Sequence, residues 1–296
     1  MSDHPIFVPF GDQHLAAVVT VPDRTQPNNL VLLLQGAGGA PRSHRNRLWT
    51  RIAAALARQG IASIRMDYLG IGDSTGEYRF EIESPPVGQA DAVLRFVAER
   101  LPVERFAIVG NCVGVPTAFQ LAAGDPACAG VVAILPVALG PVLREPGSAG
   151  GRRPESSPRS GPRLLVARFR RKVAIRRRRR APLIPEVAAV LQTGRALLLH
   201  GGTEESRRRL DRAARSAARV AGHDARLRLQ VRFLPPEGGR GFRPLRMQEL
   251  VVATVVDWLT AAFREPRAGG LQAPAAAEAM LREPLAQLRA GTPRAS

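Results

Sequence analysis

The chain has 296 residues, of which 45% are hydrophobic and 23% are charged, and its formal net charge is +18. This length and composition can bury one sizeable core, which fits one large domain or two small ones. The two cysteines are too few for a disulfide framework, and the first residues lack the basic start and apolar run of an export signal, so we expect a reducing, cytoplasmic location. No stretch reaches the roughly 20 apolar residues that span a bilayer, which argues against an integral membrane protein.

The predicted elements begin with a hairpin and continue as strands that alternate with helices. Ile6 to Phe10 and Leu15 to Val21 are expected to pair across a turn at residues 11–13. Continuous apolar runs then predict strands buried on both faces, each followed by a segment with apolar residues at helical spacing. The later strands are expected at residues 30–34, 61–66, 105–109, 130–135, 196–199 and 227–233, and the helices at 48–58, 87–100, 115–123, 205–220 and 250–263. This alternation implies crossover connections and a mainly parallel sheet flanked by helices.

One of the strands ends in a turn that is typical of a catalytic nucleophile. Phe106 to Gly114 predicts a strand, a tight turn and a helix start, and Cys112 occupies the centre of the sequence Gly-Asn-Cys-Val-Gly. Glycines on either side of such a turn let the strand and the helix pass close together. A helix N-terminus also favours a thiolate through its dipole. The alternative is that Cys112 is a small buried apolar side chain in an ordinary turn, as we expect for Cys128.

Four motifs together carry a resemblance to a known family. They are LQGAGG at residues 34–39, SHR at 43–45, RMDYLGIGDSTGE at 65–77 and GNCVG at 110–114. In these motifs the sequence resembles bacterial α/β-hydrolases of the type associated with exosortase and exopolysaccharide systems, with a cysteine at the nucleophile elbow. The resemblance implies an α/β-hydrolase fold over residues 1–264, with an arginine-rich lid insertion at 136–186 whose composition predicts partial disorder. The resemblance stops at residues 265–296, whose Ala-, Pro-, Gly- and Arg-rich composition predicts a flexible tail.

The glycine-rich loop that contains Asp67 and Asp73 is expected to be structural. Two acids beside a glycine turn are also found in metal sites, but no third ligand at suitable spacing accompanies them. We therefore expect neither a metal ion nor another cofactor.

The resemblance also implies the oxyanion donors and the acid of a catalytic triad. The loop after the first buried strand would supply the backbone N–H of Ala37, and the elbow would supply that of Val113, because a tetrahedral intermediate needs two preorganised donors. The acid would follow a late strand, where Glu204 aligns best and Glu205 is the alternative. Both glutamates could instead simply favour the positive end of the next helix.

The base of the triad is missing from the position that the family implies. In the loop after the last strand, Arg240 stands where a histidine is expected, and a guanidinium cannot accept a proton from the nucleophile. His44, beside the first oxyanion loop, and His200, after the strand that precedes the acid, are the candidate substitutes. A cysteine is partly ionised near neutrality without a base, and an arginine close to Cys112 would lower the pKa of its thiol further.

Most of the net charge lies in one segment of the insertion. Residues 141–183 contain thirteen arginines and one lysine against two glutamates, a net charge of +12. Within residues 163–180, Leu165, Phe169 and Val173 recur at helical spacing and predict an amphipathic helix. This helix would cover the acyl pocket as a lid or dock on an anionic membrane surface, and the plain alternative is a solvated lid. The final arginine run has no interleaved aromatic residues, so we expect no nucleic-acid partner.

These features lead to two hypotheses about function. The first is an enzyme that hydrolyses or transfers the acyl group of a small-molecule ester or thioester, with Cys112 as the nucleophile, Ala37 and Val113 as oxyanion donors and Glu204 as a residual acid. The second is a catalytically degenerate hydrolase fold that serves as a binding or scaffold protein. The intact elbow favours the enzyme, and Arg240 favours the scaffold.

Overall fold

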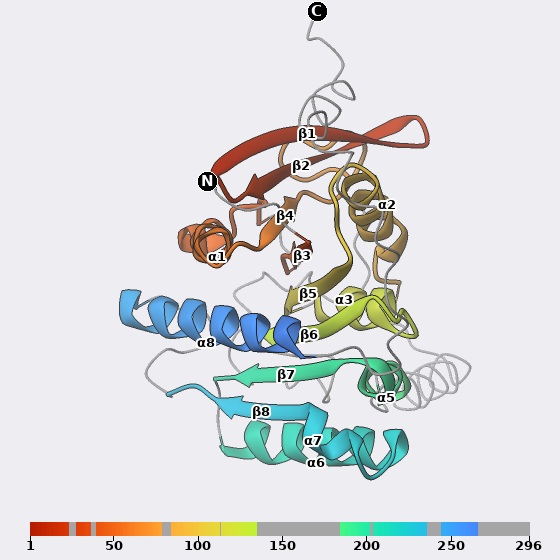
Figure 1. Ribbon diagram of the computed structural model, residues 1–296, viewed down its shortest axis with the longest axis vertical. Helices are drawn as coiled ribbons and strands as arrows, with labels where there is room; N and C mark the ends of the chain where they lie inside the picture. Colours follow the sequence, from red (N-terminus) through yellow and green to blue (C-terminus); the bar gives the residue numbers. More distant parts are fainter. Residues whose placement is uncertain are drawn as a thin grey trace, which may run out of the picture.

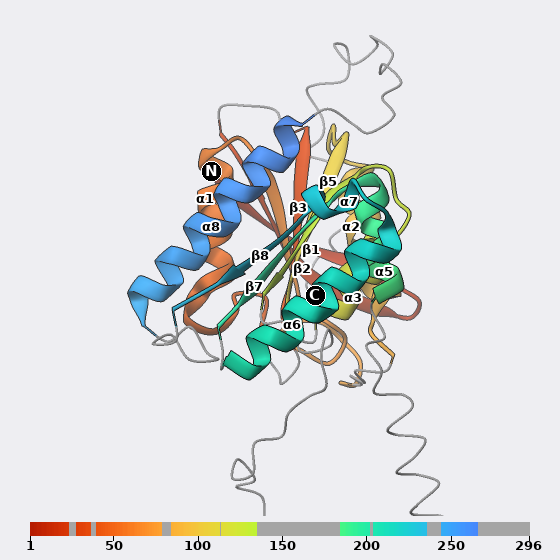
Figure 2. The same cartoon turned by 90° about the horizontal axis from the view of Figure 1, so that it is seen from below.

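The computed structural model of the chain describes residues 1–23, 28–36, 40–78, 84–112, 114–134, 184–201, 204–235 and 244–265. Within these ranges an eight-stranded sheet forms a middle layer, and helices cover both of its faces (Figure 1, Figure 2). The strand order is β1-β2-β4-β3-β5-β6-β7-β8. None of the described helices is long and apolar enough to cross a membrane.

The sheet is antiparallel at one edge and parallel elsewhere. β1 (Ser2–Phe10) and β2 (Gln13–Val21) form the expected hairpin, and β2 also pairs antiparallel with β4 (Ala62–Met66). The parallel strands are β3 (Asn29–Leu34), β5 (Arg105–Asn111), β6 (Cys128–Ile134), β7 (Arg195–His200) and β8 (Leu229–Phe233), and β3 also pairs in parallel with β4. This arrangement confirms the prediction of a mainly parallel sheet. The prediction succeeds because strands covered on both faces can be apolar throughout.

The helices form two layers, which pack against opposite faces of the sheet. One layer consists of α1 (Leu48–Arg58), preceded by a short 3-10 turn η1 (Arg45–Arg47), and α8 (Leu245–Arg264). The other consists of α2 (Val87–Ala98), α3 (Gly114–Ala122), α5 (Ile184–Thr193) and α6 (Glu204–Ala221), with the short α7 (Ala225–Arg228) before β8. Alternate residues of β3 divide between the two cores: Leu32 packs with the α2 and α3 side, and Leu33 with the α1 and α8 side.

Several predicted boundaries are wrong, each because tertiary packing extends or replaces a local pattern. Helix α5 was not expected, yet it begins at Ile184, inside the predicted insertion, since Val187 and its apolar neighbours face the core. The rest of that insertion, residues 136–183, lies outside the described residues. Helix α8 begins at Leu245 rather than at residue 250, because Met247 is already buried. Strand β6 begins at Cys128, two residues before its predicted start at residue 130.

The end of α8 is fastened to the start of β5. The guanidinium of Arg105 donates hydrogen bonds to the backbone oxygens of Phe263, at 2.9 Å, and Glu265, at 2.8 Å. The carboxylate of Glu265 forms an ion pair with Arg195 at 2.7 Å. Charged donors at a helix C-terminus satisfy carbonyls that have no partner within the helix. Glu265, the first residue of the predicted flexible tail, is therefore held in place, and residues 266–296 lie outside the described part of the chain.

Candidate active site

The strand order reverses between β3 and β5, and this reversal defines an edge where ligands bind in α/β sheets. The chain leaves β3 toward α1 on one face and leaves β5 toward α3 on the other face. The two strands are in register up to the pair Leu34 and Gly110. Loops that depart in opposite directions from neighbouring carboxyl ends leave a crevice between them. The residues that follow these two strands, Gly36 and Cys112, therefore lie at the expected position of an active site.

Cys112 occupies a strained backbone conformation at the centre of the turn. Its φ angle is +53°, in the left-handed region that L-residues rarely adopt. Its backbone N–H donates to the oxygen of Ile134 at 2.9 Å, and its backbone oxygen accepts from Val115 at 3.3 Å, so both sides of its backbone are fixed. Such a conformation costs about 1–3 kcal/mol and persists only where the surrounding structure imposes it. The half-buried thiol is thus presented at the start of α3, as the motif predicts.

The two glycines of the motif are required by close backbone contacts. A Cβ atom on Gly114 would lie 2.8 Å from the backbone oxygen of Gln35, and one on Gly110 would lie 2.7 Å from that of Gly114. Both distances are shorter than real Cβ contacts, so a side chain at either position would push α3 away from β3 and β5. The spacing Gly-x-Cys-x-Gly is therefore explained by how tightly the strand and helix pass each other.

The loop after β3 lies directly against the turn. A Cβ atom on Gly36 would be 3.1 Å from the Cβ of Cys112. The predicted oxyanion donors Ala37 and Val113 follow these two residues but lie outside the described residues, as does Arg240, so their roles remain predictions.

The predicted acid does not share a described contact with Cys112. Glu204 is the first residue of α6, its side chain is 62% exposed, and it pairs with Arg207 at 3.5 Å and with Arg208 at 3.3 Å. Glu205 pairs with Arg209 in the same first turn. The end of β7 is two strands away from β5, a separation of about 10 Å. These contacts fit the alternative interpretation, in which the glutamates stabilise a helix start.

The other candidate base, His200, ends β7 on the same side as Glu204. Its backbone oxygen accepts a hydrogen bond from Leu234 at 2.8 Å. It therefore closes the β7–β8 ladder, two strands away from the turn at Cys112.

His44, by contrast, lies next to the turn. Its Nε2 atom is 2.7 Å from the side-chain amide nitrogen of Asn111, the residue that precedes Cys112. Its ring also packs on the indole of Trp49, with the centroids 4.9 Å apart. Sequence reasoning proposed His44 as a substitute base but missed Asn111. A polar residue at the end of an otherwise apolar strand, beside a candidate nucleophile, was the signal that could have identified it.

The glycine-rich loop after β4 has the structural role that the sequence predicts. The fully buried carboxylate of Asp67 accepts a hydrogen bond from the backbone N–H of Arg42 at 2.6 Å and pairs with the guanidinium of the same residue, which also contacts Asp73 at 2.5 Å. Burial acts to lower the pKa of Arg42, but the bonds to both acids outweigh it and raise that pKa. Among the described residues no group of three or more His, Cys, Asp or Glu side chains is placed to hold a metal ion.

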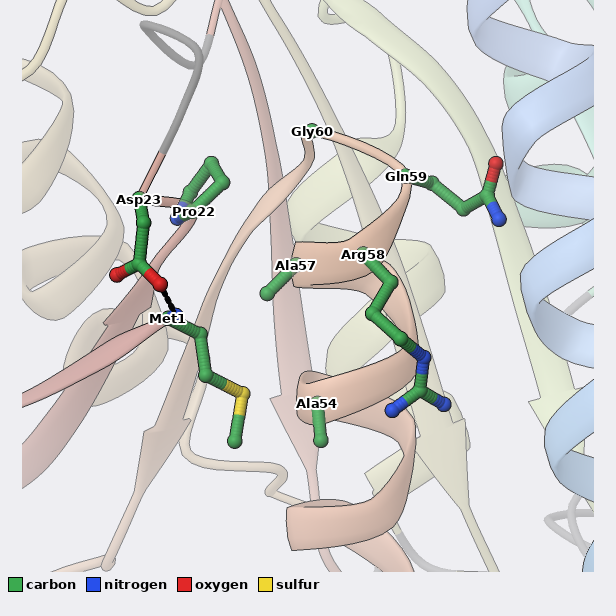
Figure 3. Close-up of a pocket in the computed structure, with 8 residues that line it drawn as sticks. All are labelled: Met1, Pro22, Asp23, Ala54, Ala57, Arg58, Gln59 and Gly60. Carbon is green, nitrogen blue, oxygen red and sulfur yellow. Dashed lines mark hydrogen bonds and ion pairs between the residues drawn. The ribbon is translucent and has the colours of Figure 1, made fainter.

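A cavity of about 620 Å³ lies at the opposite edge of the sheet (Figure 3). Its lining includes Met1 and Asp23, which form an ion pair through the N-terminal amine, and Arg58 and Gly60 at the end of α1. Gly60 precedes the amino end of β4, whereas Cys112 follows the carboxyl end of β5. This cavity therefore does not belong to the site around Cys112.

The sheet order, the two helical layers and the strained turn together constitute the α/β-hydrolase fold. A sequence profile described as alpha/beta hydrolase fold matches residues 29–150. The structure of Est1E from Butyrivibrio proteoclasticus with bound ferulic acid is similar over 88% of this chain and 100% of that one, with a TM-score of 0.62 and 15% identity.

Two further solved structures share the fold. The Pyrococcus furiosus esterase Pf2001 has a TM-score of 0.58 and 11% identity, over 88% of this chain and 91% of its own. An α-β serine hydrolase homologue from Coxiella burnetii has a TM-score of 0.54 and 15% identity, over 86% of this chain and 98% of its own. No curated protein matches the sequence.

Proposed function

We propose that the protein hydrolyses or transfers the acyl group of a small-molecule ester or thioester, with Cys112 as the nucleophile. The observation that carries this proposal is the strained, half-buried Cys112 at the carboxyl edge of the sheet, where β3 and β5 release their loops in opposite directions. One of the similar structures is named an esterase and another holds ferulic acid, so the fold can accommodate ester chemistry and a small organic acid. The motif resemblance to exosortase- and exopolysaccharide-associated hydrolases supports the choice of a cysteine nucleophile.

In the proposed reaction the thiolate of Cys112 attacks the acyl carbon and forms a carbon–sulfur bond. The negative charge moves to the acyl oxygen, where the backbone N–H groups of Ala37 and Val113 would stabilise it. Collapse of this intermediate breaks the bond to the leaving alcohol or thiol, which takes up a proton. Water or a second acceptor then releases the acyl group from the sulfur. Glu204 would contribute as a residual acid only after leaving its pairs with Arg207 and Arg208.

The second candidate function is a binding or scaffold protein with a degenerate hydrolase site. The contacts of Glu204 favour it, because this carboxylate is exposed and paired within its own helix. Arg240, in place of the expected histidine, also favours the scaffold function. Docking of residues 163–180 on an anionic membrane surface would suit such a scaffold and remains a prediction from the sequence.

The first test compares turnover in matched cysteine variants. Wild-type protein should hydrolyse aryl esters or acyl thioesters weakly, Cys112→Ala should reduce turnover to the uncatalysed rate, and Cys128→Ala should leave it unchanged, since Cys128 lies at the other edge of the sheet. If no other residue serves as the base for Cys112, Arg240→His should raise the rate, because general-base assistance contributes roughly 10²- to 10⁴-fold. If neither the wild type nor Arg240→His shows Cys112-dependent turnover on short and long acyl chains, the scaffold function replaces the enzyme.

A further inference from the structure

We propose that His44 is the general base for Cys112 and that Asn111 orients it, so that the base has moved from the loop after the last strand to the loop after β3. This inference rests on the proposed function, because it assigns a proton acceptor to the nucleophile proposed there. Cysteine, histidine and a side-chain amide form a known type of nucleophilic site, in which the amide fixes the imidazole.

The first observation is that the β3–α1 connection contacts the turn at Cys112 near both the start and the end of the connection. Gly36, at the start of the β3–α1 connection, lies against the Cβ of Cys112. His44, near the end of the same connection, lies 2.7 Å from the side chain of Asn111. Because Asn111 and Cys112 are consecutive, the imidazole is held beside the nucleophile. The chain thus supplies a titratable ring at the site without the loop that contains Arg240.

The second observation is that the position of the ring is fixed. His44 has φ +60°, and the next residues of the turn, Asn46 and Arg47, both have φ +56°. Each left-handed L-residue costs roughly 1–2 kcal/mol, so a run of such residues indicates that surrounding contacts impose the conformation. The indole of Trp49, which is fully buried, supports one side of the ring. Asn111 is itself 92% buried, so its amide cannot move freely into solvent.

The contact with Asn111 gives a useful tautomer when the amide oxygen faces the ring. The two ends of an amide are nearly the same size, and a half-turn of the Asn111 side chain presents its oxygen to the ring instead of its nitrogen. With the oxygen toward the ring, Nε2–H of His44 donates to Asn111. The basic lone pair then belongs to Nδ1, and this is the atom that takes the proton from the thiol.

Most of the charged groups on the surrounding elements are paired with one another. Arg42, close by in the same loop, is paired with both Asp67 and Asp73, which gives that group a net charge of −1. On the helical side Arg51 of α1 pairs with Glu249 of α8 at 3.5 Å. Arg47, on the turn itself, is exposed, so solvent and salt screen its charge. An imidazolium beside a thiolate is therefore compatible with its surroundings.

The step that follows is a proton transfer coupled to nucleophilic attack. The S–H bond of Cys112 breaks as the proton moves to Nδ1 of His44, and the sulfur electron pair forms the bond to the acyl carbon. When the intermediate collapses, the imidazolium returns this proton to the leaving alcohol or thiol. The ring ends the acylation half-reaction neutral, ready to deprotonate water in the second half.

The test is the pH dependence of Cys112 alkylation, compared between His44→Gly and Asn46→Gly. Glycine accepts a positive φ without strain, so both substitutions relieve the same backbone conformation and only one removes an imidazole. The rate of iodoacetamide labelling of Cys112, read from its peptide by mass spectrometry, should show an inflection in the range of histidine titration in the wild type. At pH 6.5, where an unassisted thiol is only about 1% ionised, His44→Gly should react roughly tenfold or more slowly, and Asn46→Gly should match the wild type.

Turnover gives a second readout. In His44→Gly, kcat/KM for an aryl ester or thioester should fall by about 10²- to 10⁴-fold, and added imidazole should restore part of it. If the alkylation profiles of His44→Gly and wild type coincide while Cys112-dependent turnover persists, the inference is wrong and the proposed function stands. If the profiles differ while no substrate turns over, the Cys112 and His44 pair stands and the proposed function fails. Circular dichroism of both glycine variants verifies that they fold.

Discussion

Cys112 and Cys128 lie at opposite ends of the same pair of neighbouring strands. Cys128 begins β6 beside Phe106 at the amino edge of the sheet, whereas Cys112 follows the carboxyl end of β5. Cys128 is 3% exposed, and burial raises the pKa of its thiol to about 12. Cys112 is half-buried, with a backbone φ of +53°. Both residues are cysteines, and their environments differ because they lie at opposite edges of the sheet.

The difference shows how an α/β sheet separates stability from reactivity. At the amino edge the chain enters every parallel strand after β3 from the preceding helix, and Cys128 is covered by the core that α3 and α5 complete. At the carboxyl edge the chain leaves into loops and helix N-termini, whose backbone donors attract negative charge. Burial disfavours a thiolate at the first edge, and the second edge is where the proposed function requires one.

The largest expected effect is in thiol reactivity. At pH 8 a thiol with an ordinary pKa is about one-quarter ionised, whereas one with a pKa near 12 is ionised to about one part in 10⁴, so iodoacetamide should label Cys112 at least about 10³ times faster than Cys128. Limiting reagent and peptide mapping of the native protein give the ratio, and labelling after denaturation provides the control. Equal labelling of both residues in the folded protein would contradict the comparison.

The next effect concerns the close contacts that build the turn. Gly114→Ala should lower the free energy of unfolding by about 1–3 kcal/mol, because its Cβ would lie 2.8 Å from the backbone oxygen of Gln35. Gly88→Ala in α2 is the matched control, since its Cβ would meet only the ring of Phe10 at 3.9 Å, and alanine is the better helix former. Urea denaturation of both variants measures the difference. Similar stabilities for the two variants would mean that α3 can shift without cost.

The smallest effect is an alkaline loss of stability at Cys128. The pKa of the Cys128 thiol is higher in the folded than in the unfolded protein. Ionisation of this thiol therefore leaves the free energy of unfolding unchanged below the unfolded pKa near 9 and lowers it as the pH rises toward 12. Between pH 8 and 10 the wild type should lose about 1 kcal/mol more than Cys128→Ala, and Cys112→Ala should behave like the wild type. Burial also raises the pKa of Tyr68, whose contribution begins at higher pH, so the comparison should stop at pH 10. Parallel curves for the wild type and Cys128→Ala would show that this thiol ionises without cost.

The sequence predicts the sheet well because each central strand is a continuous apolar run. Residues 30–34 and 196–199 need no tertiary information to be recognised, since only strands covered on both faces tolerate such runs. Helix α5 was missed because a long arginine- and proline-rich segment precedes it and conceals its start. The first turn of α8 was missed because Arg246 and Glu249 interrupt the apolar pattern there, although Met247 packs in the core.

The site could be predicted only in part, for a different reason. Gly-x-Cys-x-Gly is a local motif, and the strained turn at Cys112 follows from it. The contact between His44 and Asn111 joins residues 67 apart in the sequence, and neither the left-handed run before α1 nor the packing on Trp49 has a local signature. For Glu204, the motif alignment gave a position on the chain but not a side-chain direction.

The attachment of α8 to β5 has a consequence for how the protein folds during its synthesis. Val31, Ala107 and Val132 of the central strands belong to the core that α1 and α8 cover, and the carbonyl that Arg105 binds is 158 residues further along the chain. A ribosome has therefore made most of the sheet before the helix that covers one of its faces emerges. Until then the nascent chain presents an apolar surface, which makes it a substrate for chaperones and prone to aggregation, and a premature stop before residue 245 would leave that surface permanently exposed.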